Sequence, residues 1–363
     1  MRNAPIAGGR SRWIVMCVIL IWCGSVLAQP PIVVDWIQDQ LLWDNWVHGV
    51  RTSDSGSTTM YVGGDPVQEF TGCGTYVVGL SFSASGEPQY PMAPSCIEIY
   101  GISQQFCAWQ QGVLVCMDIG VPTPTVWVSG IHYSSFPTEA VAMNSGPDTY
   151  SVTDYTRHAL LVSGGNFFLG GGNGIIGGNE YDCLDRIWKT PYPTVDLGTS
   201  WTACMDNHFV TFEIWNDTLL AIGFPTVTKV DTTNGTQSGT FDLFSGSSVN
   251  NGYTAISGDT LFWASRLSDG QLHVGRYLLG SGPIWEVTLP FSGNPVKLHR
   301  DAYGRLWTAS GNNIVWLDQS DGSYQSYSIG QVVKGMDMVG STVAITGSMD
   351  GTTSYVLHGH VIP

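Results

Sequence analysis

A short apolar segment that follows a polar turn recurs along the second half of the chain. Its four copies lie at residues 216–221, 258–264, 303–309 and 340–345. Successive copies are about 40 residues apart, which is the length of one blade of a β-propeller. Each unit on its own exposes two apolar sheet faces, and packing the units around a ring buries these faces. The repeat therefore predicts an all-β fold built from a closed ring of sheets.

The first half of the chain repeats less regularly, with candidate strands at residues 76–78, 113–115 and 159–162. Together with the four later copies they make seven units, so we expect one β-propeller over residues 29–363 with seven blades, six or eight being open alternatives. Short strands at regular spacing also suit two β-sandwich domains divided near residues 191–193, which is the alternative architecture.

Tight-turn signals follow two of the repeated segments. Residues 231–235 and 318–322 have the form Asp-x-x-[Asn/Asp]-Gly, in which glycine supplies the positive φ that a tight hairpin needs. This combination of apolar strand and hairpin resembles the blades of secreted β-propellers with divergent repeats, similar to the quinoprotein-like and kelch-like families. The resemblance implies a propeller fold and assigns no role to any single residue. Residues 36–46 suit either a short helix or an opening strand.

The charge of the chain excludes one class of partner. The formal net charge is −15, and the 14 Lys and Arg residues form no cluster in the sequence. An acidic chain of this kind is repelled by the phosphate backbone of nucleic acids and by anionic lipid surfaces. We therefore expect no nucleic-acid partner.

The start of the chain has the features of a secretory signal peptide over residues 1–28. Arg2, Arg10 and Arg12 precede a short apolar stretch that ends at the small residue Ala28. The stretch is shorter than the roughly 20 residues that a helix needs to span a bilayer. We expect cleavage near Ala28, a secreted or periplasmic location, and no membrane span in the mature chain.

Six cysteines remain after such cleavage, namely Cys73, Cys96, Cys107, Cys116, Cys183 and Cys204. Export favours disulfide bonds, with buried free thiols as the alternative. Short separations favour Cys96 with Cys107 and Cys183 with Cys204, which leaves Cys73 for Cys116, although six cysteines allow fifteen pairings. The cysteines have no zinc-ligand spacing, and we expect neither a metal nor another cofactor.

The densest charged segment after the signal peptide, residues 180–188, lies where the repeat is interrupted longest. We expect an inserted loop around residues 163–192, because long insertions on repeat scaffolds often form the binding face. The candidate binding residues are Glu180, Asp182, Asp185, Arg186 and Trp188. Carboxylates beside a tryptophan can bind a cation or a sugar, or act as acid and base. A solvated loop with a surface ion pair is the alternative.

Three further patterns have structural explanations. Residues 172–177 match G-x-G-x-x-G, but without a following helix this predicts a loop and not a nucleotide site. His358 and His360 face the same side of a final strand, which suits ring closure as well as it suits a metal site. Tryptophans in or beside the repeated strands are expected between blades, namely Trp215, Trp263, Trp307 and Trp316.

These patterns favour an exported, non-catalytic propeller that presents loops to an extracellular protein or glycan. The sequence contains no G-x-S-x-G nucleophile motif. The alternative is a glycosidase or lyase that uses acidic residues at the propeller funnel, with Glu180, Asp182 and Asp185 as candidates. Such an enzyme needs two carboxylates that converge to within about 5 to 10 Å.

Overall fold

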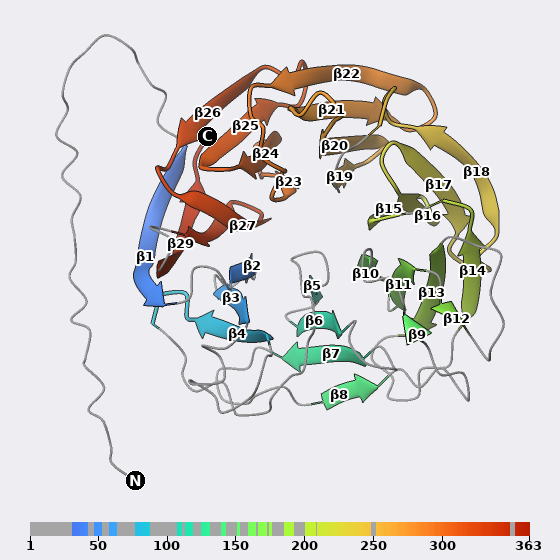
Figure 1. The fold of residues 1–363 in the computed structure, drawn as a ribbon, viewed down its shortest axis with the longest axis horizontal. Coiled ribbons are helices and arrows are strands. Elements are labelled where there is room, and N and C mark those ends of the chain that lie inside the picture. Colours follow the sequence, from blue (N-terminus) through green and yellow to red (C-terminus); the bar gives the residue numbers. More distant parts are fainter. Residues whose placement is uncertain are drawn as a thin grey trace.

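The computed structural model describes residues 31–42, 47–52, 58–63, 77–87, 107–110, 113–118, 125–130, 139–142, 151–152, 159–164, 166–172, 174–175, 185–191, 200–207, 209–247, 252–348 and 353–363. Every helix or strand assigned in these residues is a β-strand. Seven sheets of three or four strands surround a central axis, and each sheet is one blade of a β-propeller (Figure 1). This arrangement confirms the predicted ring and excludes the pair of sandwiches.

The first three blades are formed as follows. Blade 1 consists of β2 (Val47–Thr52), β3 (Thr58–Gly63) and β4 (Val77–Phe82). Blade 2 consists of β5 (Cys107–Gln110), β6 (Val113–Asp118), β7 (Thr125–Gly130) and β8 (Glu139–Ala142). Blade 3 consists of β10 (Ala159–Ser163), β11 (Asn166–Gly172), β13 (Asp185–Pro191) and β14 (Trp201–Met205).

Blades 4 to 7 complete the ring. Blade 4 consists of β15 (Thr211–Trp215), β16 (Thr218–Ile222), β17 (Thr226–Asp231) and β18 (Gln237–Asp242). Blade 5 consists of β19 (Tyr253–Ser257), β20 (Thr260–Arg266), β21 (Leu272–Leu278) and β22 (Gly282–Leu289). Blade 6 consists of β23 (Leu298–Arg300), β24 (Arg305–Ser310), β25 (Asn313–Asp318) and β26 (Tyr324–Ser328). Blade 7 consists of β27 (Val332–Val339), β28 (Thr342–Ser348), β29 (Thr353–Val361) and β1 (Ile32–Leu42).

Each blade begins in the sequence with its innermost strand. These seven strands are called the inner ring here, and each contacts the next one around the axis: β2, β5, β10, β15, β19, β23 and β27 (Figure 1). Because the blades repeat one arrangement around the axis, all inner strands begin at the same face of the ring. We call this the entry face. Connections into a blade, and connections between its second and third strands, lie at the entry face.

The repeated apolar segments form the second strand of blades 4 to 7. In β16, the four residues from Leu219 to Ile222 are all buried. Neighbouring blades cover both faces of these strands, so the strands are apolar throughout and do not alternate. The three segments of the first half are also strands, but they fall in β4, β6 and β10, which have different positions in their blades. This difference in position explains their irregular spacing.

Tryptophans fill the spaces between blades, as predicted. Trp263 and Trp307 are fully buried, and each belongs to an apolar cluster that joins two neighbouring blades. Trp316 and the partly buried Trp215 pack in the same clusters. Aromatic side chains therefore bury apolar area between blades and help to hold the ring together.

A second tryptophan contact recurs on outer strands. Trp201 lies against Gly235 in the hairpin of the next blade, and its indole N–H donates to the Thr232 carbonyl at 2.9 Å. Trp285 lies in the same way against Gly322 and donates to the Gln319 carbonyl at 3.2 Å. In both hairpins the glycine is the last residue of the Asp-x-x-[Asn/Asp]-Gly motif. The motif therefore serves as a docking point for a tryptophan of the preceding blade.

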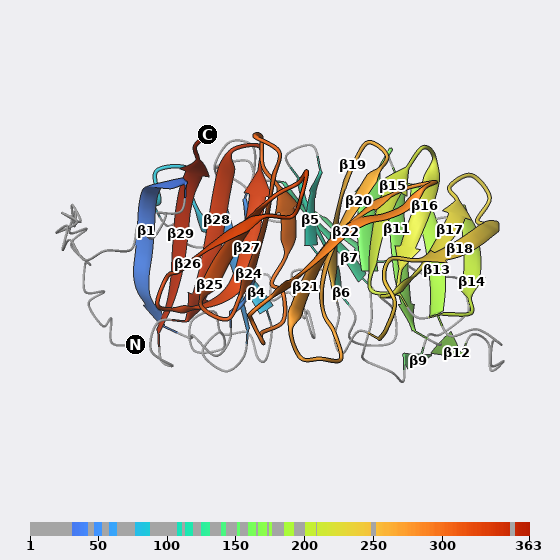
Figure 2. The ribbon, with the colours of Figure 1, turned by 90° about the horizontal axis from the view of Figure 1, so that it is seen from above.

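The first described strand closes the ring. β1 is the outermost strand of blade 7 and pairs with β29, with Ile32 opposite Val361 (Figures 1 and 2). The indole N–H of Trp36 donates to the Ala84 carbonyl of blade 1 at 3.0 Å, and the ring lies against Gly86. Residues 36–42 are therefore strand and not helix. The pairing of β1 with β29 therefore closes the ring.

Most of the residues on which the expectations about export and disulfide bonds depend lie outside the described residues. Residues 1–30, with the expected signal peptide, are not described, nor are Cys73, Cys96 and Cys183. Cys204 is disulfide-bonded. The backbone register places Cys107 opposite Cys116 on neighbouring strands, a pair that the expected pairing did not include. No helix in the described part of the chain is long and apolar enough to cross a membrane.

Candidate functional site

The predicted binding segment divides into a described and an undescribed part. Asp185, Arg186 and Trp188 lie on β13, the third strand of blade 3, whereas Glu180 and Asp182 lie outside the described residues. The expectation of a loop throughout residues 163–192 is therefore wrong. β11 and β13 pair within this range because their apolar side chains, such as those of Phe168 and Ile187, are buried in the core.

The interruption of the repeat is an insertion between β11 and β13. Within it, β12 (Gly174–Ile175) pairs with β9 (Ser151–Val152), which comes from the connection that leads into blade 3. Both connections belong to the entry face, and Figure 2 shows this small sheet beyond the end of the blades. We call β9 and β12 the platform. The glycine-rich motif at residues 172–177 therefore lies at a strand end and in the platform, with no helix among its described residues.

A carboxyl group that the sequence analysis missed lies on the inner ring. Glu213 on β15 accepts a hydrogen bond from the Thr254 hydroxyl on β19 at 2.8 Å. Burial raises the pKa of the Glu213 carboxyl to about 7, while the hydrogen bond and the charge of Lys297 act in the opposite direction. Part of the side chain still reaches solvent. The signal available in the sequence was a single carboxylate among the apolar and aromatic residues Phe212, Ile214 and Trp215.

Asp337 is the second carboxylate in the strands of the inner ring. One oxygen accepts the backbone N–H of Thr52 at 2.9 Å, and the other lies 3.4 Å from Nε2 of His299. These contacts join blades 6, 7 and 1 beside the axis. Glu213 and Asp337 lie on blades 4 and 7, so adjacent inner strands do not supply the converging pair that a glycosidase needs.

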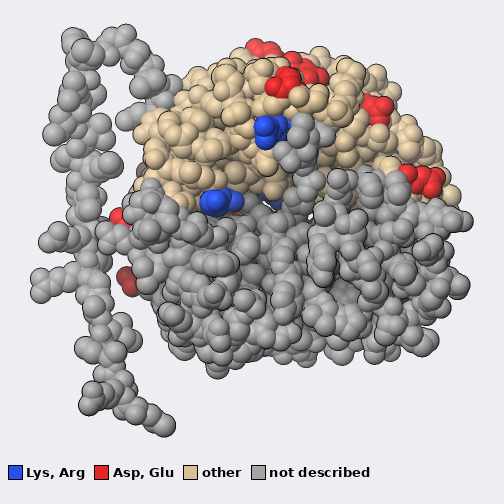
Figure 3. Space-filling model, viewed as in Figure 1, with Lys and Arg blue, Asp and Glu red and all other residues tan. Residues whose placement is uncertain are grey.

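Two lysines lie near the starts of adjacent inner strands. Lys297 immediately precedes β23, and its ammonium lies 5.6 Å from the centre of the Tyr253 ring. Lys334 is exposed on β27. In the described half of the molecule, Figure 3 shows basic side chains toward the middle and acidic ones mainly along the outer edge.

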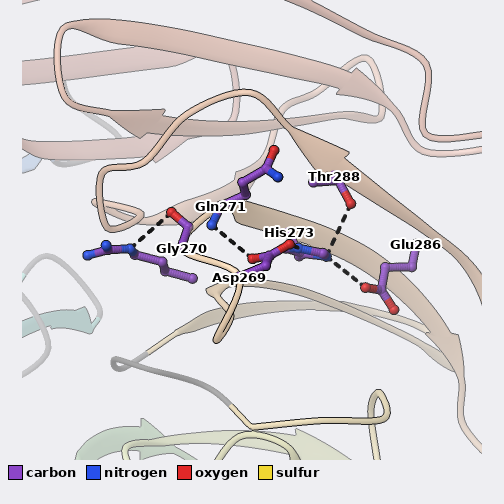
Figure 4. A network of polar contacts seen from close by, with 7 residues as sticks. Asp269, Gly270, Gln271, His273, Glu286 and Thr288 are labelled. Atoms are coloured by element: carbon purple, nitrogen blue, oxygen red, sulfur yellow. Dashed lines mark hydrogen bonds and ion pairs between the residues drawn. The ribbon is translucent and has the colours of Figure 1, made fainter.

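A histidine network lies farther from the axis, on blade 5 (Figure 4). The two ring nitrogens of His273 each lie 2.8 Å from a carboxylate, Nε2 from Asp269 and Nδ1 from Glu286. Both contacts are hydrogen bonds only when both nitrogens carry protons. The backbone N–H of Gln271 and the His273 ring lower the pKa of Asp269. The network ties the turn between β20 and β21 to the outer strand β22.

The histidine pair of the last strand faces β1. Nδ1 of His358 and Nδ1 of His360 lie 3.3 Å and 3.0 Å from the two oxygens of Asp35. The ring of Trp36 stacks on His358 with centroids 5.2 Å apart. Among the described residues, no group of three or more His, Cys, Asp or Glu side chains is placed to hold a metal ion. The pair therefore contributes to ring closure.

No family model and no curated protein sequence matches this chain. Solved β-propeller structures do. The WD40 domain of Pan2 from Neurospora crassa superposes with a TM-score of 0.58 at 9% identity, over 93% of this chain and 98% of that one. A chain of the mitotic checkpoint complex gives 0.60 at 11% identity, over 98% and 100%. Virginiamycin B lyase from Staphylococcus aureus gives 0.53 at 12% identity, over 90% and 99%.

The class that these matches define is the β-propeller. The identities are too low to indicate a shared activity, so the matches establish the fold alone. The chain shares its architecture with a lyase and with a chain of the mitotic checkpoint complex, and the choice between such roles depends on its own residues.

Proposed function

We propose that the protein is an exported, non-catalytic β-propeller that binds an extracellular protein or glycan through its entry face. The observation that carries this proposal is the platform. Two connections of different origin pair with each other at one face, and β13, with Asp185 and Arg186, is the next assigned strand after β12. A small sheet built from insertions is a typical place for recognition residues on a rigid repeat scaffold.

The segment that borders the platform has the composition of a recognition surface. Residues 180–188 combine carboxylates, an arginine and aromatic side chains. Arginine and aromatic residues dominate protein interfaces, and aromatic residues with carboxylates suit sugars. The expected signal peptide supports export, and the disulfide of Cys204 agrees with an oxidising compartment.

The test compares binding with turnover on one set of sugars. The purified chain, tested on a glycan array and against the same sugars in solution, should bind without hydrolysing them. The double variant Glu180→Gln/Asp182→Asn should lose at least about tenfold in binding. The double variant Asp217→Asn/Asp321→Asn removes the same charge from exposed turns of the opposite face and should bind normally. Equal losses in both variants would contradict the proposal.

A protein partner is tested by chemical cross-linking, with the same pair of variants for comparison. Carboxyl-directed chemical cross-linking of the chain in its native extracellular medium should place cross-links at the platform and at Asp185, at the entry-face end of β13. Cross-links confined to the outer strands would contradict an entry-face partner.

A glycosidase or lyase is the second candidate, and Glu213 favours it. A carboxyl with a pKa of about 7 can both release and take up a proton near neutral pH. If the protein cleaves any sugar of the array, and if Glu213→Gln abolishes this cleavage without changing binding, the enzyme proposal replaces the first one.

A further inference from the structure

The cysteines that follow the expected signal peptide belong to the part of the chain that forms blades 1 to 3. Cys204, on β14 of blade 3, is the last of them, whereas the four repeated apolar segments begin at residue 216. In blades 4 to 7 these segments are strands buried along almost their whole length. The cysteines therefore lie in the half of the ring where the apolar repeat is irregular. Disulfide bonds commonly supplement a limited apolar core in exported proteins.

Two of these cysteines lie opposite each other on β5 and β6 of blade 2. Cys107 pairs with Cys116 in the register, and Gln110 pairs with Val113, which leaves a connection of two residues between the strands. The residues that flank a two-residue hairpin connection exchange hydrogen bonds, and non-hydrogen-bonded and hydrogen-bonded pairs alternate from there along the ladder. Cys107 and Cys116 are the third pair beyond the flanking one. They are therefore a non-hydrogen-bonded pair.

A non-hydrogen-bonded pair has the backbone spacing that a disulfide needs. The Cα atoms of such a pair lie about 4.5 Å apart, compared with about 5.5 Å in a hydrogen-bonded pair. Disulfides join residues whose Cα atoms are about 4.4–6.8 Å apart and whose Cβ atoms are about 3.5–4.5 Å apart. Opposite Cβ atoms come closest together in non-hydrogen-bonded pairs. The register therefore allows a disulfide at this position without a shift of either strand.

The hairpin favours this bond over the pairings that short separations indicated. Those pairings need two bonds that leave the hairpin, one from Cys107 to Cys96 and one from Cys116 to Cys73. The second closes the much longer loop from residue 73 to residue 116, and longer loops cost more entropy to close. Pairing of β5 with β6 already holds Cys107 and Cys116 together at no further cost in chain entropy.

We propose that a disulfide joins Cys107 to Cys116 across the first two strands of blade 2. The two thiols give up two protons and two electrons as the S–S bond forms. A disulfide-bearing thiol oxidoreductase of the export compartment accepts both and becomes a dithiol. The bond ties the start of β5, which belongs to the inner ring, to β6. This inference shares only export with the function proposed above, and its test involves no ligand, so either proposal can fail alone.

The pairing of the other four cysteines follows from this bond. Cys204 is disulfide-bonded and lies on β14, which pairs with β13. Cys183 comes two residues before β13 in the sequence, whereas Cys73 and Cys96 both come before the first strand of blade 2. The proposal therefore assigns Cys204 to Cys183, as short separation predicts, and Cys73 to Cys96.

The test maps the disulfides of the full chain after secretion into an oxidising medium. Free thiols are first blocked with N-ethylmaleimide in urea without a reductant, and the chain is then digested with chymotrypsin, which cuts after aromatic residues. Cuts after Phe106 and Trp109 leave Cys107 on a peptide of its own. Mass spectrometry should find this peptide linked to the one that contains Cys116, and reduction should release both. Cys107 linked to any other cysteine, or blocked by N-ethylmaleimide, overturns the proposal.

Two matched variants test the pairing through the thiol that each one releases. Cys107→Ser should leave Cys116 free to react with N-ethylmaleimide, whereas a native bond from Cys107 to Cys96 would make Cys96 react instead. Cys204→Ser is the control, because the same substitution in blade 3 should release Cys183 and preserve the link between Cys107 and Cys116. Reaction of Cys96 in the Cys107 variant overturns the proposal. If a variant is not secreted, the disulfide map of the unmodified chain decides alone.

Discussion

Gly322 and Gly280 both have positive φ, but their surroundings differ. A Cβ atom at Gly322 would lie 2.9 Å from the Trp285 ring, whereas a Cβ atom at Gly280 would meet no atom within 4 Å. The first glycine is needed both for its backbone conformation and for contact between blades. The second is needed for its conformation alone. A pair of substitutions can therefore separate the two requirements.

We predict that Gly322→Ala destabilises the protein more than Gly280→Ala does. The positive φ costs roughly 1–2 kcal/mol for alanine at either position. At Gly322 the displaced tryptophan adds about 1–3 kcal/mol of steric strain. The free energy of unfolding in urea measures both effects. Equal losses in the two variants would show that the tryptophan contact contributes nothing to stability.

Glu213 yields a prediction for the pH dependence of stability. Its pKa is about 7 in the folded protein and close to 4.5, the ordinary value of a solvated glutamate, in the unfolded chain. The folded state therefore holds the proton more tightly, and the free energy of unfolding falls as the pH rises from about 4.5 to about 7. The loss is on the order of 3 kcal/mol. Glu213→Gln cannot ionise, so its unfolding free energy should decline less over this range. Parallel declines in both proteins, measured by urea unfolding, would refute the assignment.

The strands that the sequence predicted best are those whose two faces are both covered by neighbouring blades. β16, β20, β24 and β28 are buried along almost their whole length, and only apolar side chains satisfy that environment. The outer strands were not identified, because β18 and β26 are exposed along nearly their whole length and lack an apolar pattern. Their strand conformation results from hydrogen bonding to the third strand of the blade. Local sequence does not contain that information.

The candidate sites were predicted less completely than the fold. The charge density at residues 180–188 was visible in the sequence, but Ile187 is fully buried, and this burial draws Asp185 and Arg186 into a strand. Glu213 comes near Thr254 and Lys297 only when blades 4, 5 and 6 pack around the axis. Contacts of this kind depend on ring closure, which no spacing within one blade reveals.

We predict that Trp36→Ala loosens β1 without unfolding the other blades. Trp36 stacks on His358 and donates to the Ala84 carbonyl, so it joins β1 to blade 7 and to blade 1. Its removal should increase amide hydrogen exchange over residues 32–42 and lower the unfolding free energy by about 2 kcal/mol. Val34→Thr, an exposed position on the same strand, is the control. Unchanged exchange in the tryptophan variant would mean that backbone pairing alone holds the strand.

At the scale of the whole molecule, the two ends of the described chain are adjacent. The backbone N–H of Ile362 donates to the Pro31 carbonyl at 2.8 Å. Blade 7 takes three strands from the C-terminal end and one from the N-terminal end, so the ring is closed by hydrogen bonds and not by a covalent link. Any blade could serve as the closing blade if the chain were opened before its outermost strand.

A circular permutant tests this view of closure. A short Gly-Ser linker joins residue 363 to residue 31, and the chain is opened between Gly280 and Ser281, in the exposed turn that precedes β22. β22 then becomes an N-terminal outer strand that closes blade 5, as β1 closes blade 7 in the natural chain order. We predict the same β-sheet circular dichroism spectrum and a cooperative unfolding transition, because adjacent ends make such rearrangements tolerable. A version that starts at Ser281 and also lacks residues 31–42 leaves blade 7 without its outer strand, and it should unfold at a lower urea concentration. If the complete permutant were as unstable as this truncated one, closure would depend on β1 itself and not on filling the fourth position of a blade.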